Sequence, residues 1–456
     1  MMETLYAAAQ RIGARLIGDN AGFARVVTDT RQLAAGDLFV ALKGENFDGH
    51  DFVAQAGARG AVGALVSRVV DCALPQIVAD DTLTALQRYA ASWRNDFDLP
   101  VVAVTGSNGK TTTKQLLSAV FAARGPVLAT QGNLNNHIGV PLTLLSLRRE
   151  HRTAVIEMGA NHLGEIALLT QLARPDVGVI TQAGDAHLEG FGSREGVARG
   201  KGELFAGLSA GGVAVINADD VYAPLWRELA ASASIISFGF GEHADVRAVH
   251  AQPDPAEAPT GMRFELRAPE GRQTVTLPLP GRHNVGNALA AAACGVALGM
   301  DLRDIAAGLA RVQAPQGRLN WKATPEGARL LDDSYNANPT SLRAGMELLA
   351  GLGGERILAL GGMAELGADA PRLHREAGEA AKALGIDRLY ALGPLAAEAA
   401  QGFGAGGQAF DDADALAAAL RPQLNKNVVL LVKGSRSSRM ERVVAALTGD
   451  GGKGEH

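Results

Sequence analysis

Short apolar runs rich in valine, isoleucine and leucine recur along the middle of the chain, each close to a stretch with helical spacing. The runs lie at 101–105, 154–158, 177–181 and 213–217, and the helical stretches at 83–93, 114–120, 165–173 and 202–208. This alternation is typical of strands that are buried on both faces and joined by helices. We therefore predict that residues 83–312 form an α/β domain with a largely parallel sheet, whose ligands bind at the carboxyl ends of its strands.

Two further domains are predicted on either side of this central one. Residues 1–82 combine a helical stretch with two short apolar runs, which indicates a small α/β domain. Its helical stretch is 5–12 and its runs are 25–28 and 37–42. Residues 313–456 repeat the strand, glycine and helix order and are predicted to form a Rossmann-like α/β domain. Its apolar runs are 328–331, 356–360, 388–392 and 428–432.

One part of the central domain has a different period. Apolar and polar residues alternate over 262–266 and 275–279, on either side of Pro269–Glu270–Gly271. This predicts an antiparallel hairpin beside the main sheet. An alanine-rich helix is expected at 288–298, after the polar segment 280–287.

Composition restricts the class of protein. A chain of 456 residues with 47% hydrophobic and 20% charged residues can bury the cores of about three domains. The net charge of −5 gives no electrostatic reason to expect nucleic acid as a partner. Two cysteines are too few for a disulfide framework, and neither a signal peptide nor an apolar run of membrane-spanning length is evident. We expect a cytoplasmic protein without membrane insertion.

The strongest chemical signal is the segment 105–113, Thr-Gly-Ser-Asn-Gly-Lys-Thr-Thr-Thr, which separates a strand-like run from a helical stretch. Glycines let backbone N–H groups approach an anion, and the helix N-terminus adds positive dipole density. Lys110 would reach the β- and γ-phosphates, and the Thr111 hydroxyl would sit on Mg²⁺. The strict motif has glycine where this chain has Val104, so the loop is a shorter variant. The predicted phosphate site comprises Gly106, Ser107, Asn108, Gly109, Lys110, Thr111 and Thr112.

Three residues further along could act near these phosphates. Glu157 ends an apolar run, and a carboxylate at a later strand end is the usual magnesium ligand in a phosphate-loop domain, so we predict that role. His187 lies in a polar loop just past another run, and its sequence context favours a ligand and an ordinary loop residue equally. Lys201, judged by spacing alone, is an exposed lysine at the start of a helix.

Two clusters of amides and hydroxyls follow predicted strands. Asn133, Asn135 and Asn136 lie within four residues; asparagine is common in loops, but three together suit a polar substrate. The second cluster, 332–341, includes Tyr335, Asn336 and Asn338. Pro339 stops the strand there and a following hydroxyl can cap a helix, yet so dense a polar cluster predicts a site.

The N-terminal domain offers two polar segments. One contains Asp29, Thr30 and Arg31, and the other runs through Phe47, Asp48 and His50. The second segment could be a solvated turn capped by an aspartate. It could equally be a recognition loop in which Phe47 or His50 stacks on a planar or sugar-bearing ligand. Both interpretations stay open.

Taken in order, these segments resemble the Mur ligases, the ATP-dependent amide-forming enzymes of bacterial cell-wall precursor synthesis. The resemblance covers all three predicted domains. It rests on 105–112, Glu157, 186–188, 201–203, 281–287, Gly317–Arg318 and Asp332–Asp333. One departure is Gly362: the family pattern Leu-Gly-Asp-Met-x-Glu-Leu-Gly has an acid there, so any role of that acid is in doubt.

The resemblance implies roles for individual residues. Lys110 and the loop amides would hold the ATP phosphates, with Thr111 and Glu157 on one Mg²⁺. His187 and Lys201 would hold a second Mg²⁺, because Lys201 is carbamylated in this family and so becomes an oxygen ligand. This implied role replaces the interpretation of Lys201 as an ordinary exposed lysine. Lys110, His187, Lys201 and Arg318 would act in catalysis. The remaining implied contacts are adenine for Asn284 and Asn287, the γ-phosphate for Arg318, the ribose for Asp333, and the UDP end of the acceptor for Asp29, Thr30, Arg31, Phe47, Asp48 and His50.

The implied reaction activates the carboxylate of UDP-N-acetylmuramoyl-tripeptide as an acyl phosphate and joins it to D-alanyl-D-alanine. The segments 132–136, 333–341 and 433–436 favour this dipeptide-adding activity within the family. The Asp-Asn-Pro-Arg motif expected of the diamino-acid-adding member is absent from the C-terminal part of the sequence. The alternatives are that ligase, a folylpolyglutamate synthetase-like ligase, or a nucleotide-dependent switch protein without ligation. We expect a monomer.

Overall fold

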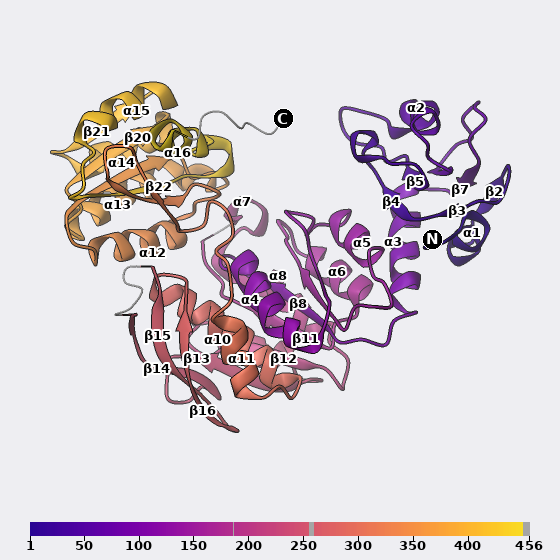
Figure 1. The fold of residues 1–456 in the computed structure, drawn as a ribbon, viewed down its shortest axis with the longest axis horizontal. Helices are drawn as coiled ribbons and strands as arrows, with labels where there is room; N and C mark the ends of the chain where they lie inside the picture. Colours follow the sequence, from indigo (N-terminus) through magenta and orange to yellow (C-terminus); the bar gives the residue numbers. More distant parts are fainter. Residues whose placement is uncertain (186, 255–259, 450–456) are drawn as a thin grey trace.

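The computed structural model describes residues 1–185, 187–254 and 260–449. Two parts of the chain that were considered above lie outside the described residues. They are Ala186, in the segment 186–188 that contributes to the family resemblance, and the tail from residue 450. Three α/β bodies follow one another along the chain, and the N-terminal and C-terminal bodies lie on opposite sides of the central one (Figure 1). This arrangement confirms the predicted three-domain α/β class.

The N-terminal domain is built on a five-stranded sheet of order β2-β7-β6-β5-β4, in which β2 alone is antiparallel to its neighbour. A small antiparallel pair, β1 with β3, lies apart from this sheet. Its strands and helices are β1 (Glu3–Thr4), α1 (Leu5–Ile12), β2 (Arg15–Ile17), β3 (Gly22–Phe23), β4 (Arg25–Val27), β5 (Asp37–Val40), α2 (Val53–Ala58), β6 (Gly63–Val66) and β7 (Gln76–Val78).

The central domain holds a nine-stranded sheet of order β16-β15-β14-β13-β12-β11-β8-β10-β9, parallel from β9 to β14. Its first half is α3 (Thr82–Arg94), β8 (Val101–Thr105), α4 (Lys110–Phe121), β9 (Val127–Ala129), α5 (Gly139–Leu144), β10 (Thr153–Glu157), α6 (Glu165–Ala173), β11 (Val177–Ile180), α7 (Leu188–Phe191) and α8 (Arg194–Ala206). Its second half is β12 (Val213–Asn217), α9 (Ala223–Leu229), β13 (Ser234–Gly239), β14 (Val246–Pro253), β15 (Met262–Ala268), β16 (Gly271–Leu277), α10 (Arg282–Ala297) and α11 (Leu302–Leu309).

The predicted hairpin is confirmed as β15 and β16, but it is not a separate unit. Strand β14 pairs in parallel with β13 and antiparallel with β15, so the hairpin extends the main sheet. Three helices also begin several residues earlier than predicted: α10 starts at Arg282, α4 at Lys110 and α8 at Arg194. Polar side chains obscured these starts in the sequence, because apolar periodicity marks only the buried turns of a helix.

The C-terminal domain has a six-stranded sheet of order β17-β18-β22-β19-β20-β21, in which only β17 is antiparallel. Its elements are β17 (Asn320–Ala323), β18 (Arg329–Asp333), α12 (Pro339–Ala350), β19 (Glu355–Gly361), α13 (Ala370–Ala383), β20 (Arg388–Leu392), α14 (Pro394–Phe403), β21 (Gly407–Phe410), α15 (Ala413–Leu420), β22 (Val428–Lys433) and α16 (Glu441–Thr448). The predicted Rossmann-like pattern of strands and helices is confirmed.

Helix α3 connects the first two domains. Its buried residues Leu86 and Tyr89 belong to one apolar cluster with Leu5 of α1 and Val101 of β8. The Tyr89 hydroxyl also donates to Glu3 at 2.9 Å. The N-terminal and central domains therefore share a core, and the predicted boundary between residues 82 and 83 stays a prediction. Among the described residues, no helix has the length and apolar character needed to cross a bilayer.

Candidate active site

A cavity of about 970 Å³ opens between the central and C-terminal domains. The carboxyl ends of β8 and β10 form one side, and residues that follow β18 form another. Eighteen of the predicted site residues line it: Ser107, Asn108, Gly109, Lys110, Thr111, Thr112, Asn133, Asn135, Asn136, Glu157, His187, Asn284, Asn287, Arg318, Asp333, Tyr335, Asn336 and Asn338. The fold thus brings together polar segments that lie up to 231 residues apart in the sequence.

Glycine is required at two positions of the phosphate loop. Gly106 has φ +143°, and a Cβ there would lie 1.9 Å from Thr181 Oγ1. Gly109 has φ +81°, and a Cβ there would lie 2.2 Å from Asn287 Oδ1. The Thr181 hydroxyl donates to the Asn108 carbonyl at 2.6 Å, which holds the loop against β11. No larger residue fits this loop without moving its neighbours.

The loop leads into α4 with its backbone donors open. Gly109 caps the helix without a side-chain hydrogen bond, so the first-turn N–H groups stay available to an anion. Lys110 Nζ donates to the Gly106 carbonyl at 2.7 Å. Burial lowers the pKa of Lys110, although the charge of Glu157 acts in the opposite direction. This geometry fits a polyphosphate, whose negative charge would restore a favourable environment for the ammonium group.

Glu157 is almost fully buried and has three polar side chains around its carboxylate. Asn135 Nδ2 donates to Oε1 at 2.8 Å, and the Thr111 hydroxyl lies 3.4 Å from the same oxygen. Lys114 Nζ lies 3.2 Å from Oε2. Burial alone would raise the pKa of Glu157, but the charges of Lys114 and Lys110 outweigh it, and the pKa lies below its ordinary value. The carboxylate is therefore ionised and fixed beside Thr111.

The position of Lys201 contradicts the prediction, made from spacing alone, of an exposed lysine at the start of a helix. It lies in the interior of α8, not at its start, and has no exposed surface. Its Nζ donates to the Ala160 carbonyl at 3.1 Å and lies 5.2 Å from the centre of the Phe191 ring. Burial lowers its pKa well below the ordinary value. The prediction from spacing is wrong because other elements cover α8 on several sides. The helix face that carries polar residues is therefore not exposed to solvent.

His187 joins the two domains at the edge of the cavity. Its Nδ1 contacts the Glu365 carboxylate, which comes from the loop after β19. Burial and the charge of Lys110 lower its pKa, and Glu365 acts in the opposite direction. Both His187 and Glu365 have left-handed backbone angles, at φ +56° and +62°. The structure therefore places His187 at the site, with a partner that sequence reasoning did not identify.

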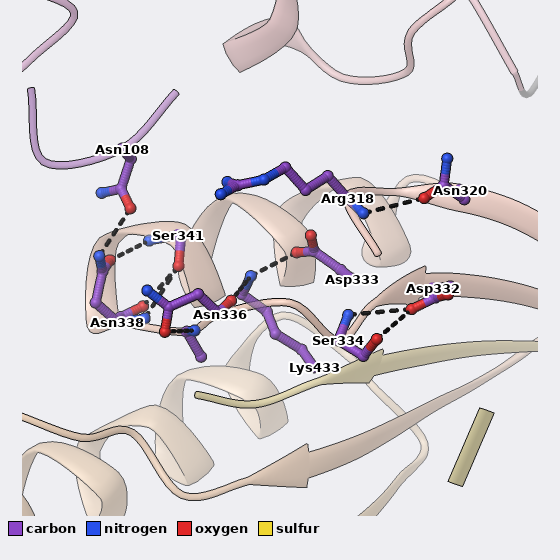
Figure 2. A network of polar contacts seen from close by, with 11 residues as sticks. Asn108, Arg318, Asn320, Asp332, Asp333, Ser334, Asn336, Asn338, Ser341 and Lys433 are labelled. Atoms are coloured by element: carbon purple, nitrogen blue, oxygen red, sulfur yellow. Dashed lines mark hydrogen bonds and ion pairs between the residues drawn. The ribbon is translucent and has the colours of Figure 1, made fainter. Parts of the chain in front are cut away.

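The polar cluster after β18 meets the phosphate loop directly (Figure 2). Asn338 caps α12 in a reciprocal pair with Ser341 and donates from Nδ2 to Asn108 Oδ1 at 2.7 Å. Arg318 Nη2 donates to the Thr111 hydroxyl at 3.2 Å, and its guanidinium lies 4.5 Å from the centre of the Tyr335 ring. The C-terminal domain thus contacts the loop through side chains that also line the cavity.

Asp333 lies at the end of β18 and is paired with Lys433 at the end of β22. Lys433 Nζ lies 2.5 Å from Asp333 Oδ2 and donates to the Asn336 carbonyl at 3.0 Å (Figure 2). Burial raises the pKa of Asp333 despite the charge of Lys433. The pair fixes the Asn336 backbone at the wall of the cavity.

The two asparagines of α10 lie against the phosphate loop. Asn284 Nδ2 donates to the Pro280 carbonyl at 2.8 Å, and Asn287 Nδ2 donates to Asn284 Oδ1 at 3.1 Å. Because Asn287 also packs on Gly109, the start of α10 and the start of α4 face the same end of the cavity.

The N-terminal candidates lie elsewhere, since none of them lines this cavity. Asp29 caps a short helical turn and pairs with Arg31 at 2.8 Å, and Thr30 Oγ1 lies 3.5 Å from Gln55. These residues follow β4, and Phe47 to His50 follow the neighbouring parallel strand β5, so both segments belong to one sheet edge.

The stacking role considered for His50 does not fit this geometry. The residue is 4% exposed, its Nδ1 contacts Asp48 at 2.6 Å, and its Nε2 accepts from the Ser67 backbone at 2.9 Å. Asp48 caps the next turn and pairs with Arg68 at 2.9 Å. His50 therefore anchors its loop, whereas Phe47 is 58% exposed and free to meet a ligand.

Sequence reasoning missed Lys114, Glu365 and Lys433. Lys114 stands four residues after Lys110 on α4, which places both on one helix face, but a helix-interior lysine is normally solvated. Lys433 ends an apolar strand, which is the same signal that identified Glu157. Glu365 is the glutamate of the family pattern that surrounds Gly362, but the pattern does not indicate its contact with His187, which exists only once the two domains meet.

The donor set fits a magnesium nucleotide. Within the described ranges, no three histidine, cysteine, aspartate or glutamate side chains gather as a metal site. A cation at Thr111 and Glu157 would therefore complete its coordination with phosphate and water oxygens, as Mg²⁺ commonly does.

A second cavity, of about 530 Å³, adjoins the first in the C-terminal domain. Ala364, Ser435 and Ser437 line both cavities. Small and apolar residues such as Gly362, Pro394 and Leu395 form part of its wall. An ideal Cβ at Gly362 would lie 3.6 Å from the Leu395 Cβ, an ordinary contact distance, so a side chain could begin at this position without a collision.

A phosphate loop that faces polar residues of a separate α/β domain across one cavity is the arrangement of an enzyme that uses a nucleotide to activate a second substrate. Family models match the chain in order: the Mur ligase family, catalytic domain, at residues 23–92, the Mur ligase middle domain at 104–295, and the Mur ligase, glutamate ligase domain, at 317–436. The chain belongs to the Mur ligase family and is an ATP-dependent ligase.

The chain is similar over its length to proteins named UDP-N-acetylmuramoyl-tripeptide–D-alanyl-D-alanine ligase. The relative from Escherichia coli K12 is 46% identical over 93% of this chain and 94% of its own length, and that from Bacillus subtilis is 38% identical over 92% of each. Among solved structures, MurF from Acinetobacter baumannii has a TM-score of 0.92 at 38% identity, covering 98% of this chain and 99% of that one. MurF ligase from Thermotoga maritima in complex with ADP has a TM-score of 0.82 at 29% identity, covering 93% and 97%.

Proposed function

We propose that this protein joins UDP-N-acetylmuramoyl-tripeptide to D-alanyl-D-alanine in peptidoglycan precursor synthesis, converting ATP to ADP and phosphate. One observation carries the proposal: the phosphate loop and the 333–341 cluster line a single cavity, with Asn108 and Asn338 in contact. The relatives named for this reaction match almost the whole chain and so support the same substrates.

The reaction begins with attack of the tripeptide carboxylate on the γ-phosphorus of ATP, which gives an acyl phosphate and releases ADP. The amine of D-alanyl-D-alanine then attacks the acyl carbon, and phosphate leaves from the tetrahedral intermediate. Two anions meet in the first step, so cationic groups must offset their repulsion. Lys110 of the phosphate loop and Arg318, which donates to the Thr111 hydroxyl, would supply that charge.

Two magnesium ions fit the proposed chemistry. Thr111 and Glu157 would hold one, and His187 with a carbamate on Lys201 would hold the other. When bound, these ions would neutralise phosphate charge. Carbamylation requires a neutral amine, since the nitrogen lone pair adds to CO₂ and the ammonium proton must be lost. The low pKa that burial gives Lys201 supports this modification.

We also propose the remaining substrate contacts. We assign adenine to Asn284 and Asn287 at the start of α10, and the ribose to Asp333. The UDP end of the acceptor is assigned to the sheet edge that carries Asp29, Thr30, Arg31, Phe47 and Asp48, and the polar peptide to Asn133, Asn135, Asn136, Tyr335 and Asn336. The dipeptide would lie in the second cavity, whose shared wall brings its amine toward the first.

The organisation of the chain completes the proposal. We divide it into an N-terminal domain at 1–82, an ATP-binding domain at 83–312 and a C-terminal ligase domain at 313–456. Each interval contains its own large sheet. We further propose that the protein acts as a monomer in the bacterial cytoplasm on small-molecule substrates.

Phosphate release by the purified protein tests this function. With ATP, Mg²⁺ and the UDP-linked tripeptide, we expect release only when D-alanyl-D-alanine is added. Turnover only with a free diamino acid would identify the diamino-acid-adding alternative, and amine-independent ATP hydrolysis would identify a switch protein. Lys201→Ala should abolish ligation and recover part of it with a short added carboxylate; an unaffected variant would refute the carbamate.

A further inference from the structure

Lys114 is an unusual lysine, because it is 3% exposed in the interior of α4 and lines neither cavity. Burying a cation without a partner is costly, and the partner here is Glu157, at 3.2 Å. The ammonium group also lies 3.5 Å from the Gly132 carbonyl. Lys114 therefore lies behind Glu157, away from the space that a nucleotide or peptide would fill.

The two oxygens of Glu157 have different surroundings as a result. Oε1 is met by Thr111 and Asn135, which both line the cavity, while Oε2 is met by Lys114. The carboxylate is thus paired with Lys114 through Oε2, while Oε1, which accepts a hydrogen bond from Asn135, lies on the cavity side beside Thr111. Its negative charge is already balanced by a permanent neighbour.

The charges around this carboxylate decide which cation it can bind. Lys114 pairs with Glu157, and the charges of Lys110 and Arg318 also act on this carboxylate. Lys110 lies in the phosphate loop, and Arg318 contacts Thr111, whose hydroxyl lies beside Glu157. A free divalent cation gains little there, because the repulsion from these groups offsets the attraction of Glu157. A cation that arrives with a polyphosphate carries enough negative charge to be attracted.

We propose that Lys114 is a positioning residue that makes the divalent cation enter with the nucleotide, by fixing Glu157 through Oε2 and cancelling its charge. The proposal rests on the proposed use of a magnesium nucleotide. It assigns Lys114 a role in the order of binding, with no contact to substrate.

Titration of the nucleotide-free protein with Mn²⁺ alone, followed by electron paramagnetic resonance, tests this role. We expect weak binding to the wild type and at least about tenfold tighter binding to Lys114→Met, since a neighbouring positive charge has been removed. The gain should disappear in Lys114→Met/Glu157→Gln, which shows that it belongs to this carboxylate. Lys426→Met, which removes an exposed lysine, should bind Mn²⁺ like the wild type.

Two outcomes would overturn the proposal: equal Mn²⁺ affinity in Lys114→Met and the wild type, or a gain that persists without Glu157. Lys114→Gln repeats the measurement if the methionine variant does not fold, and Lys114→Arg, which keeps the charge, should stay weak. Failure of the proposed function is distinguishable, because it would appear as wild-type protein that releases no phosphate in response to D-alanyl-D-alanine. That result does not depend on the Mn²⁺ titration.

Discussion

Replacing Gly109 by alanine tests whether the phosphate loop in this structure is the nucleotide-binding conformation. At φ +81° an alanine is strained, and its Cβ would lie 2.2 Å from Asn287 Oδ1, which therefore has to move. Moving Asn287 endangers its hydrogen bond to Asn284, at 3.1 Å. A single added methyl group thus disturbs both the loop and the start of α10.

The cost can be worked out from these two effects. The left-handed conformation disfavours alanine by about 1–2 kcal/mol, and losing a hydrogen bond costs about 1 kcal/mol. The two effects add up to about 2–3 kcal/mol, which the free protein can avoid if its loop relaxes to another conformation. The nucleotide must then return the loop to its binding conformation, so its affinity falls about 30- to 150-fold.

Calorimetric titration with Mg²⁺ and ADP measures the change. Gly164→Ala is the matched control, because Gly164 has φ +87° and nothing lies within 4 Å of its would-be Cβ. It carries the same backbone strain without a collision, so its nucleotide affinity should equal that of the wild type. If Gly109→Ala binds within about threefold of the wild type, or Gly164→Ala is equally impaired, the collision does not govern binding.

Three other changes have defined outcomes. Lys433→Met leaves the buried Asp333 carboxylate without its cation and should lower the free energy of unfolding, measured in urea, by about 3–5 kcal/mol. Adding Asp333→Asn should recover much of this loss. If stability is not recovered, the pairing is contradicted. Leu395→Trp should narrow the second cavity and raise the KM for D-alanyl-D-alanine about tenfold, with the KM for ATP unchanged. A rise in both KM values would argue against a separate dipeptide site. Burial and the charge of Lys433 hold the pKa of His283 at about 4, below the ordinary 6.5. As the pH falls, His283 is therefore protonated in the unfolded chain before it is protonated in the folded protein. Up to about 3 kcal/mol of stability, fully present above pH 6.5, is lost toward pH 4. His283→Gln should make the free energy of unfolding in urea less dependent on pH over this range, and an unchanged slope would contradict the low pKa of His283.

The sequence predicts those features of the fold that local pattern determines. The apolar run 101–105 is buried on both faces: Val101 and Ala103 belong to one core cluster, and Val102 and Val104 to another. A run without alternation is what such a central strand requires. The phosphate loop is equally local, because nine consecutive residues carry its glycines, its lysine and its hydroxyls.

Contacts between distant segments are what the sequence could not show. The burial of Lys201 depends on Ala160 and Phe191, which cover a helix whose own residues include arginine, lysine and glutamate. Glu365 reaches His187 only because two domains are adjacent. Periodicity reports which face of an element is apolar, whereas the site depends on which elements meet. The family resemblance supplied the importance of Lys201, and the structure supplied its environment.

The distribution of the cores gives the molecule a mechanical asymmetry. The N-terminal and central domains are joined through an apolar cluster that runs through α3, and separating them would expose it to water. The C-terminal clusters, among the described residues, begin only at Leu319, and the contacts that tie this domain to the phosphate loop are amide, guanidinium and hydroxyl pairs. Such pairs can exchange their partners for water at little net cost. The first two domains should therefore rotate as one body, with the third swinging on the linker before Leu319, so that substrates can enter and products leave without any core being opened.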